Sequence, residues 1–202
     1  MRTLITMVRL ALSVLVASAI GWQFRIHVAN GFDPVNFFSY FTNLSNALAA
    51  AVFFAVALRS VGGKGSTPFV DRLRFASAVN MVIVGIVFAL LLRDVDLGTL
   101  RPEINILLHY VMPSAALVDW LLDPPSTQLR RADLLRAEIF PLLYLTYTMI
   151  RGHFTGWYPY PFLTPANAGG YGGVGVYAIA IAVTFVVVGV CLMRTSRKRS
   201  SP

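Results

Sequence analysis

Residues 37–58, FFSYFTNLSNALAAAVFFAVAL, form a stretch long and apolar enough to cross a lipid bilayer. Its first third nevertheless carries five hydrogen-bonding side chains: Ser39, Thr42, Asn43, Ser45 and Asn46. At about 100° per residue, all of them except Ser45 fall on one face of a helix. Because polar groups facing lipid go unsatisfied, this face is predicted to line the protein interior or a wet cavity.

The apolar character of this stretch recurs along the whole chain. Of the 202 residues, 56% are hydrophobic and only 13% are charged, whereas about a quarter are charged in a soluble domain. Six apolar segments of near-spanning length are joined by short connections: residues 4–24, 37–58, 75–92, 104–122, 134–150 and 172–193. The sequence therefore predicts an all-α, polytopic membrane protein, with residues 1–202 forming one domain of six transmembrane helices.

The net charge of +8 is distributed unevenly between the two sides of such a bundle. If the N-terminus is cytoplasmic, 13 of the 17 lysine and arginine residues lie on the cytoplasmic side. The outer side then holds only Arg25, Arg93, Arg101 and Arg151. This is the positive-inside pattern, so we expect a multi-pass plasma-membrane protein with both termini in the cytoplasm. The basic charge then reports topology and indicates no nucleic-acid partner.

Two features near the termini affect this topology. Residues 2–19 resemble a signal peptide, with two arginines, an apolar run and ASA at 17–19. The apolar character continues through residues 20–24, which favours an uncleaved first helix. The single cysteine, Cys191, excludes an internal disulfide and is predicted to be a small core residue.

The fourth segment contains the only histidine within a predicted span, His109, with Asn105 and Asp119 on the same helical face. An ionisable side chain inside a membrane is a candidate functional group. Pro113 lacks an N–H and leaves the His109 carbonyl without its usual helical partner, so a kink is expected beside the imidazole.

Depth brings Thr42 and His109 together. Both lie about five residues into helices that enter from the same face, and a rise of about 1.5 Å per residue places both on the order of 8 Å deep. Tyr144, Thr148 and Arg151 share a face of the fifth segment and are predicted to converge on the same pocket. Asp119 lies about 15 Å deeper than His109, too far for a direct hydrogen bond.

A threonine next to a histidine suggests nucleophilic catalysis, because a neutral imidazole can take the hydroxyl proton. Asn43, Asn46 or backbone N–H groups near the helix start are then candidates to stabilise an oxyanion, and Arg151 is a candidate to hold a carboxylate. Threonine in a membrane helix usually bonds its own i−4 carbonyl, however, and Asn and Ser often tie helices together. The residue pattern alone therefore predicts a polar site in the outer leaflet and leaves its chemistry open.

The last connection, residues 151–175, mixes aromatic residues with prolines before a run of glycines. Aromatic residues of this kind favour the headgroup zone. We expect an outer loop on the membrane surface, acting either as a lid or substrate entrance or as an anchor without chemistry.

Four motifs carry a family resemblance: FSYFTNLSN (38–46), LLHYVMP (107–113), DWLL (119–122) and YPYPFL (158–163). In order and spacing they resemble the androgen-induced-gene family of multi-span membrane proteins, which includes the androgen-dependent TFPI-regulating proteins; the chain looks like a bacterial-type relative. Animal members are threonine hydrolases that cleave fatty acid esters of hydroxy fatty acids. The resemblance implies Thr42 as nucleophile, His109 as base, a lipid ester as substrate and no cofactor. Ala49 and Ala50 are then expected to border an acyl-chain tunnel.

Two other hypotheses stay open. In the first, the protein is a non-enzymatic transporter or a lipid- or small-molecule-binding protein whose polar stripe lines a path. The absence of polar groups from Ala49 to Leu58 weakens this reading. In the second, His27, His109 and His153 bind zinc or haem, but they lack short metal-ligand spacing, so no metal is expected.

Overall fold

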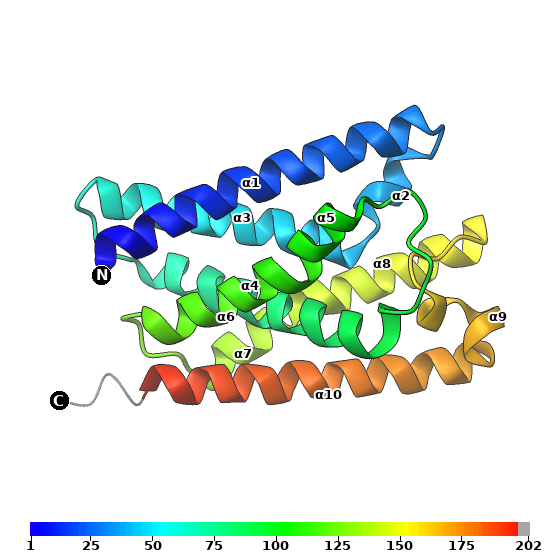
Figure 1. The fold of residues 1–202 in the computed structure, drawn as a ribbon. Helices are drawn as coiled ribbons and strands as arrows, with labels where there is room; N and C mark the ends of the chain where they lie inside the picture. Colours follow the sequence, from blue (N-terminus) through cyan, green and yellow to red (C-terminus); the bar gives the residue numbers. More distant parts are fainter. Residues whose placement is uncertain (198–202) are drawn as a thin grey trace.

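The structure is a computed structural model that describes residues 1–197, and within this range it is all-α, without strands (Figure 1). The α-helices are α1 (Arg2–Ala29), α2 (Pro34–Phe38), α3 (Phe41–Val61), α4 (Pro68–Val87), α5 (Pro102–Ile106), α6 (Met112–Leu122), α7 (Arg131–Ala137), α8 (Ile139–Thr155), α9 (Pro165–Ala168) and α10 (Gly170–Arg197). Two π-helical turns, η1 (Phe88–Leu92) and η2 (Leu107–Val111), and a 3₁₀ turn, η3 (Pro161–Leu163), complete the fold.

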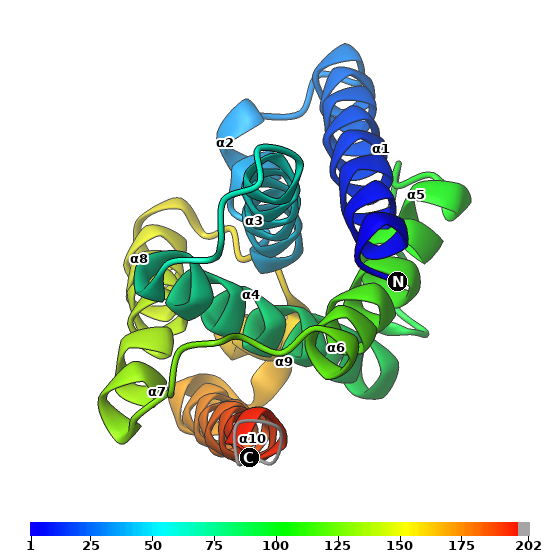
Figure 2. The same ribbon diagram turned by 90° about the vertical axis from the view of Figure 1, so that its left-hand side faces the viewer.

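The long helices run side by side as a bundle, and α1 begins at the end of the bundle where α10 finishes (Figure 1). Seen from that end, α4 lies in the middle (Figure 2). It packs against α3 on one side and against α6 and α10 on others, while α1 packs mainly on α3 and also touches α5 and α6. The central position of α4 explains why its described side chains are the most buried of the long helices.

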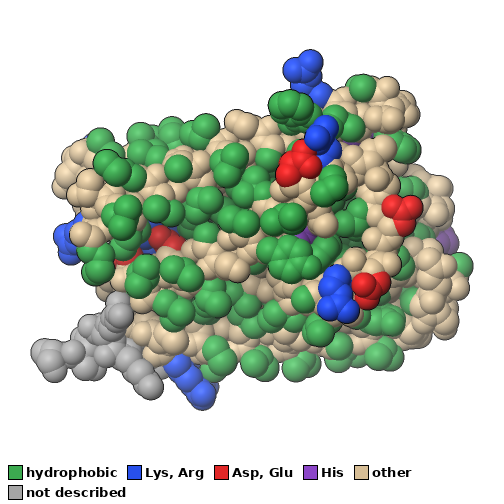
Figure 3. Space-filling model, in the orientation of Figure 1, with side chains coloured by type: hydrophobic (Ala, Val, Ile, Leu, Met, Phe, Trp, Pro, Cys, Tyr) green, Lys and Arg blue, Asp and Glu red, His purple; other side chains and the backbone are tan. Residues whose placement is uncertain are grey.

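Within the described residues, five helical segments are long and apolar enough to cross a membrane: Arg2–Ala29, Phe41–Val61, Pro68–Leu92, Pro102–Leu122 and Gly170–Ser196. They coincide with five of the six predicted spans, so the all-α class is confirmed and the fold is that of a candidate multi-pass membrane protein. Hydrophobic side chains cover the broad middle of the visible face (Figure 3). An apolar outside of this kind suits contact with lipid.

The remaining predicted span, 134–150, is divided between α7 and α8, with the break at Glu138. Pro141 causes this break, since it has no N–H to donate to the carbonyl four residues earlier and its ring crowds that carbonyl. The helix that follows, α8, has 17 residues and is about 26 Å long.

The N-terminal end of α3 differs from the predicted start of the second span. The chain turns at Ser39 and Tyr40, so α2 ends at Phe38 and α3 begins at Phe41. Ser39 caps the end of α2, where its hydroxyl donates to the Val35 carbonyl (2.7 Å), which corrects its predicted place on the polar face of the second span. Ser45, predicted to lie outside that face, is fully buried because α3 is enclosed by both α1 and α4.

The expected distortion next to Pro113 is present as the π-helical turn η2, which contains His109. A π-bulge is a usual response to a residue that interrupts the regular hydrogen-bond ladder, and such turns are frequent at functional sites. The start of α6, directly after this turn, packs closely on α4: a Cβ added at Gly85 would lie 3.1 Å from the Pro113 Cβ. Glycine at this position lets the two helices approach each other.

A buried ionic cluster ties α1, α4 and α6 together near the end of the bundle where α1 begins. Arg9 Nε lies 2.7 Å from Asp119 Oδ1, and Arg9 Nη2 lies 2.7 Å from Asp123 Oδ2. Arg74 Nη2 lies 3.2 Å from the second oxygen of Asp119. The guanidinium groups are almost fully buried, with side chains 3% and 6% exposed. Asp119 is therefore bound to arginines, and it is separate from His109 as its depth predicts.

Cys191 lies on the exposed side of α10, so its predicted place in the core is wrong. An apolar residue on a membrane helix can face lipid as readily as the protein interior, and the sequence around Cys191 does not distinguish the two.

Candidate functional site

Thr42 and His109 meet inside the bundle. The Thr42 Oγ1 atom lies 3.3 Å from His109 Nε2, and both side chains are buried. Thr42 comes from the first turn of α3 and His109 from η2, two elements joined by a long stretch of chain. The contact agrees with the prediction that the two residues share one depth.

The hydroxyl of Thr42 makes a different contact from the hydroxyls of several other helical threonines. Several of them donate to the carbonyl four residues earlier: Thr6, Thr146, Thr155 and Thr184. This is the usual structural role of threonine in a membrane helix. Thr42 is the second residue of α3, so the helix offers no carbonyl at that position, and its hydroxyl instead faces the imidazole.

The imidazole of His109 is held in one orientation. Its Nδ1 lies 3.1 Å from the Asn105 carbonyl oxygen. A carbonyl can only accept, so the neutral ring carries its proton on Nδ1 and presents a bare Nε2 to the Thr42 hydroxyl. The Phe88 ring stacks on the imidazole at a centroid distance of 4.0 Å. Asn105, predicted to share a helical face with His109 and a candidate to bind substrate, thus contributes its backbone carbonyl to this arrangement.

The two asparagines predicted as oxyanion donors have their amide N–H groups engaged elsewhere. Asn46 Nδ2 donates to the carbonyls of Thr42 (2.9 Å) and Leu108 (3.1 Å), and Asn43 Nδ2 donates to the Phe37 carbonyl (2.8 Å). Asn46 is fully buried and bridges the residue next to His109 with Thr42 itself. Its amide therefore fixes the spacing of the pair.

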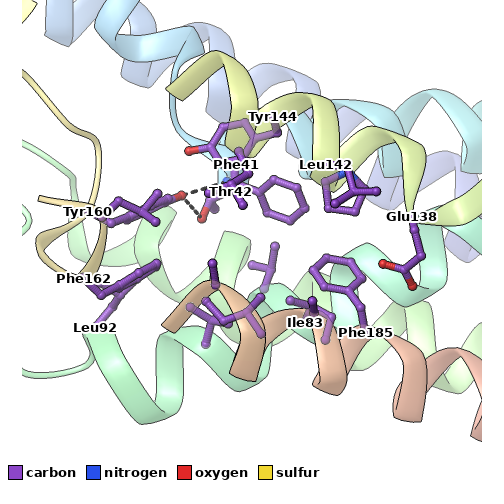
Figure 4. Close-up of a pocket in the computed structure, with 18 residues that line it drawn as sticks. Phe41, Thr42, Ile83, Leu92, Glu138, Leu142, Tyr144, Tyr160, Phe162 and Phe185 are labelled. Atoms are coloured by element: carbon purple, nitrogen blue, oxygen red, sulfur yellow. Dashed lines mark hydrogen bonds between the residues drawn. The ribbon is translucent and has the colours of Figure 1, made fainter. Parts of the chain in front are cut away.

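The loop that follows α8 adds a residue that sequence analysis did not identify. The Thr42 backbone N–H donates to Tyr160 Oη (3.2 Å), and this oxygen also lies 3.4 Å from Thr42 Oγ1 (Figure 4). Tyr160 is 8% exposed, and burial raises the pKa of its phenol to about 12. The phenol stays protonated at neutral pH. This part of the loop is packed into the bundle rather than laid on its surface.

Two cavities meet at Thr42 and Tyr160. The first, of about 100 Å³, is almost wholly apolar and lies between α3, α4, α8 and α10, with Glu138 at its far end (Figure 4). The second, of about 380 Å³, has more polar walls, which include His109, Asn43 and His27. Ala49 and Ala50, expected to border an acyl-chain tunnel, lie in the protein core and line neither of these two cavities.

The residues predicted on the fifth span only partly converge on this site. Tyr144 lines the apolar cavity and donates its hydroxyl to the Ser39 carbonyl (2.9 Å). Thr148 is buried but lines neither cavity. Arg151 donates to Asn36 Oδ1 (2.7 Å) and forms an ion pair with Asp33 (3.5 Å). Its guanidinium therefore holds α2 against α8, and its predicted place in the pocket with Thr42 is wrong.

Among residues 1–197, no group of three His, Cys, Asp or Glu side chains is placed to hold a metal ion. His27 Nε2 contacts the Asp33 carbonyl (2.9 Å), and His153 Nδ1 contacts the Tyr171 hydroxyl (3.2 Å). Each of the three histidines thus has a separate set of partners.

Neither a protein-family model, nor a curated protein, nor a solved structure matches this chain. The functional conclusion therefore depends on Thr42, His109 and the groups around them.

Proposed function

We propose that the protein is a membrane-embedded hydrolase of lipid esters, with Thr42 as the nucleophile and His109 as the general base. The observation that carries the proposal is the buried Thr42 Oγ1–His109 Nε2 contact of 3.3 Å, with Nδ1 directed at the Asn105 carbonyl. A hydroxyl is a weak nucleophile until a neighbouring base takes its proton, and that base is effective when a third group orients it.

The reaction proceeds in two halves. Thr42 Oγ1 attacks the ester carbonyl carbon while its proton passes to His109 Nε2. The tetrahedral intermediate then expels the alcohol, which takes that proton, and an acyl ester of Thr42 remains. A water molecule, deprotonated by Nε2, attacks this ester and releases the fatty acid, and the proton returns to Thr42 Oγ1.

The cavities on either side of Thr42 support a lipid as the substrate. The apolar cavity suits an acyl chain, and the larger, more polar cavity suits the alcohol half and the hydrolytic water. The family resemblance supports the same substrate class and narrows it to fatty acid esters of hydroxy fatty acids.

An active-site-directed fluorophosphonate tests the nucleophile directly. We expect it to label the purified wild-type protein and to leave Thr42→Ala unlabelled, because no other hydroxyl is paired with His109. Thr184→Ala is the matched control, since its hydroxyl donates to a carbonyl of its own helix. Equal labelling of wild type and Thr42→Ala would exclude Thr42 as the nucleophile.

We further propose six membrane crossings in the plasma membrane, with both termini in the cytoplasm. An even number of crossings is supported by the position of the start of α1 and the end of α10 at one end of the bundle. We assign the sixth crossing to α8, beside the five long apolar helices. The positive-inside distribution of arginine and lysine supports the orientation.

Cysteine labelling checks this orientation. In a Cys191→Ser background, we expect a membrane-impermeant maleimide to label Asp94→Cys on intact cells and Lys64→Cys only after lysis. Both positions are exposed, on the connections that follow η1 and α3. The reverse pattern would mean that the termini lie outside, and labelling of both on intact cells would contradict the six-crossing topology.

A further inference from the structure

A hydrolase of this kind needs a hydrogen-bond donor for the oxyanion that forms on the ester carbonyl oxygen. The donors next to Thr42 are mostly engaged. Both asparagine amides on this part of α3 donate to backbone carbonyls, and the Ser39 hydroxyl donates to Val35. The Thr42 N–H itself donates to Tyr160.

The Tyr160 hydroxyl is different, because it accepts the Thr42 N–H and its own proton is not donated to a backbone carbonyl; Thr42 Oγ1 and the Tyr144 hydroxyl are its neighbours. That proton is within reach of Thr42 Oγ1, but the oxygen–oxygen distance of 3.4 Å is long for an O–H···O hydrogen bond. A negatively charged oxygen nearby is a better acceptor than a neutral threonine hydroxyl.

The surroundings of Tyr160 hold its ring in place. The Phe162 ring stacks on it at 5.2 Å, and Tyr40 meets it edge-on at 5.7 Å. The neighbouring Tyr158 packs so closely on α8 that a Cβ added at Gly152 would lie 2.1 Å from its ring. The loop is therefore seated firmly, and its buried hydroxyl lies where the two cavities meet, beside the atom that would attack the ester.

We propose that Tyr160 is a catalytic residue of this site. Its phenolic O–H donates a hydrogen bond to the oxyanion of the tetrahedral intermediate. The inference depends on the proposed hydrolase function. The Thr42 N–H fixes the phenol oxygen, so the donor is already oriented before the substrate arrives, which is the condition under which such donors are most effective. The phenol keeps its proton throughout, and no bond to it is made or broken.

The test replaces Tyr160 with Phe, which removes only the hydroxyl, and follows hydrolysis of 4-nitrophenyl octanoate by the purified full-length protein. We expect kcat to fall by roughly a hundredfold, the lower end of the usual effect of one oxyanion donor, since the freed Thr42 N–H substitutes in part. Tyr158→Phe is the matched control from the same loop and is expected to keep wild-type turnover.

An alkyl trifluoromethyl ketone supplies a second readout, because its adduct with Thr42 carries the oxyanion whereas a plain ketone of the same length does not accumulate one. We expect Tyr160→Phe to bind the fluorinated ketone more weakly by about the same factor as kcat/KM falls, and to bind the plain ketone as the wild type does. Equal weakening of both would indicate a damaged cavity and would overturn the proposal.

The two proposals fail in different ways. Wild-type turnover by Tyr160→Phe, with Thr42→Ala inactive, overturns the role of Tyr160 and leaves the hydrolase standing. Wild-type turnover by Thr42→Ala overturns both. If Tyr160→Phe does not fold, 3,5-difluorotyrosine at this position keeps the hydroxyl and lowers its pKa. Activity should then be lost at a lower alkaline pH than in the wild type, and an unchanged profile contradicts the proposal.

Discussion

His109→Ala is expected to lower the rate of ester hydrolysis by roughly 10²–10⁴-fold, the range that general-base catalysis contributes. In the proposed reaction, loss of the imidazole leaves the Thr42 hydroxyl without the base that takes its proton, so it stays a weak nucleophile. The loss is expected in kcat and kcat/KM alike, because proton transfer stabilises the transition state rather than the bound substrate. It should therefore persist at saturating concentrations of 4-nitrophenyl octanoate.

His153→Ala is the matched control, since His153 is exposed and contacts Tyr171. It should hydrolyse the ester at the wild-type rate. Added imidazole should restore part of the activity of His109→Ala, because a small base can enter the space left beside Phe88. A folded His109→Ala protein with wild-type turnover would show that another group takes the proton from Thr42.

Asp119→Ala is expected to lower the free energy of unfolding by about 3–5 kcal/mol, the typical cost of breaking a buried ion pair. One carboxylate oxygen of Asp119 pairs with Arg9 and the other pairs with Arg74. Removal of the carboxylate therefore leaves each of the two buried guanidinium groups with one partner fewer. The midpoint of thermal unfolding in detergent should fall on the order of 10 °C.

Asp94→Ala is the matched control for this substitution, because Asp94 is 87% exposed and pairs only at the surface with Arg93. Its thermal midpoint should match the wild type. Asp119→Asn should lie between the two, since the amide oxygen can still accept one of the guanidinium N–H groups. Equal midpoints for Asp119→Ala and Asp94→Ala would mean that the cluster contributes nothing to stability.

The Thr42–His109 contact is predictable from sequence because two simple quantities determine it: the rise of a helix and the direction in which each helix enters the bilayer. The start of α3 is harder. The run FFSYFT carries no glycine or proline to mark the turn at Ser39 and Tyr40, so the apolar pattern reads as one helix. Because the helix start is predicted wrongly, the short helix α2 is missed as well. The hydrogen bond that Arg151 donates to Asn36 of α2 is therefore missed too.

The position of Tyr160 cannot be predicted from the periodicity of hydrophobic residues. It contacts Thr42 from 118 positions away in the chain, and it comes from an irregular segment with no repeating pattern to fix its direction. An aromatic residue between prolines at the end of a span is typical of the headgroup zone. Only the fold turns this side chain inward. Cys191 illustrates the opposite case, in which the same apolar composition suits both the core and the lipid-facing surface.

The pairing of Arg9 with Asp119 and Asp123 also bears on how the chain is made. During synthesis Arg9 enters the membrane long before the carboxylates of α6 exist. Until α6 arrives, its long side chain must reach back to the interface and keep its charge in water. Proteolysis after Ala19 would discard Arg9 and leave those carboxylates to Arg74 alone. The docking of α1 through Arg9 is thus complete only when the second half of the chain is in place.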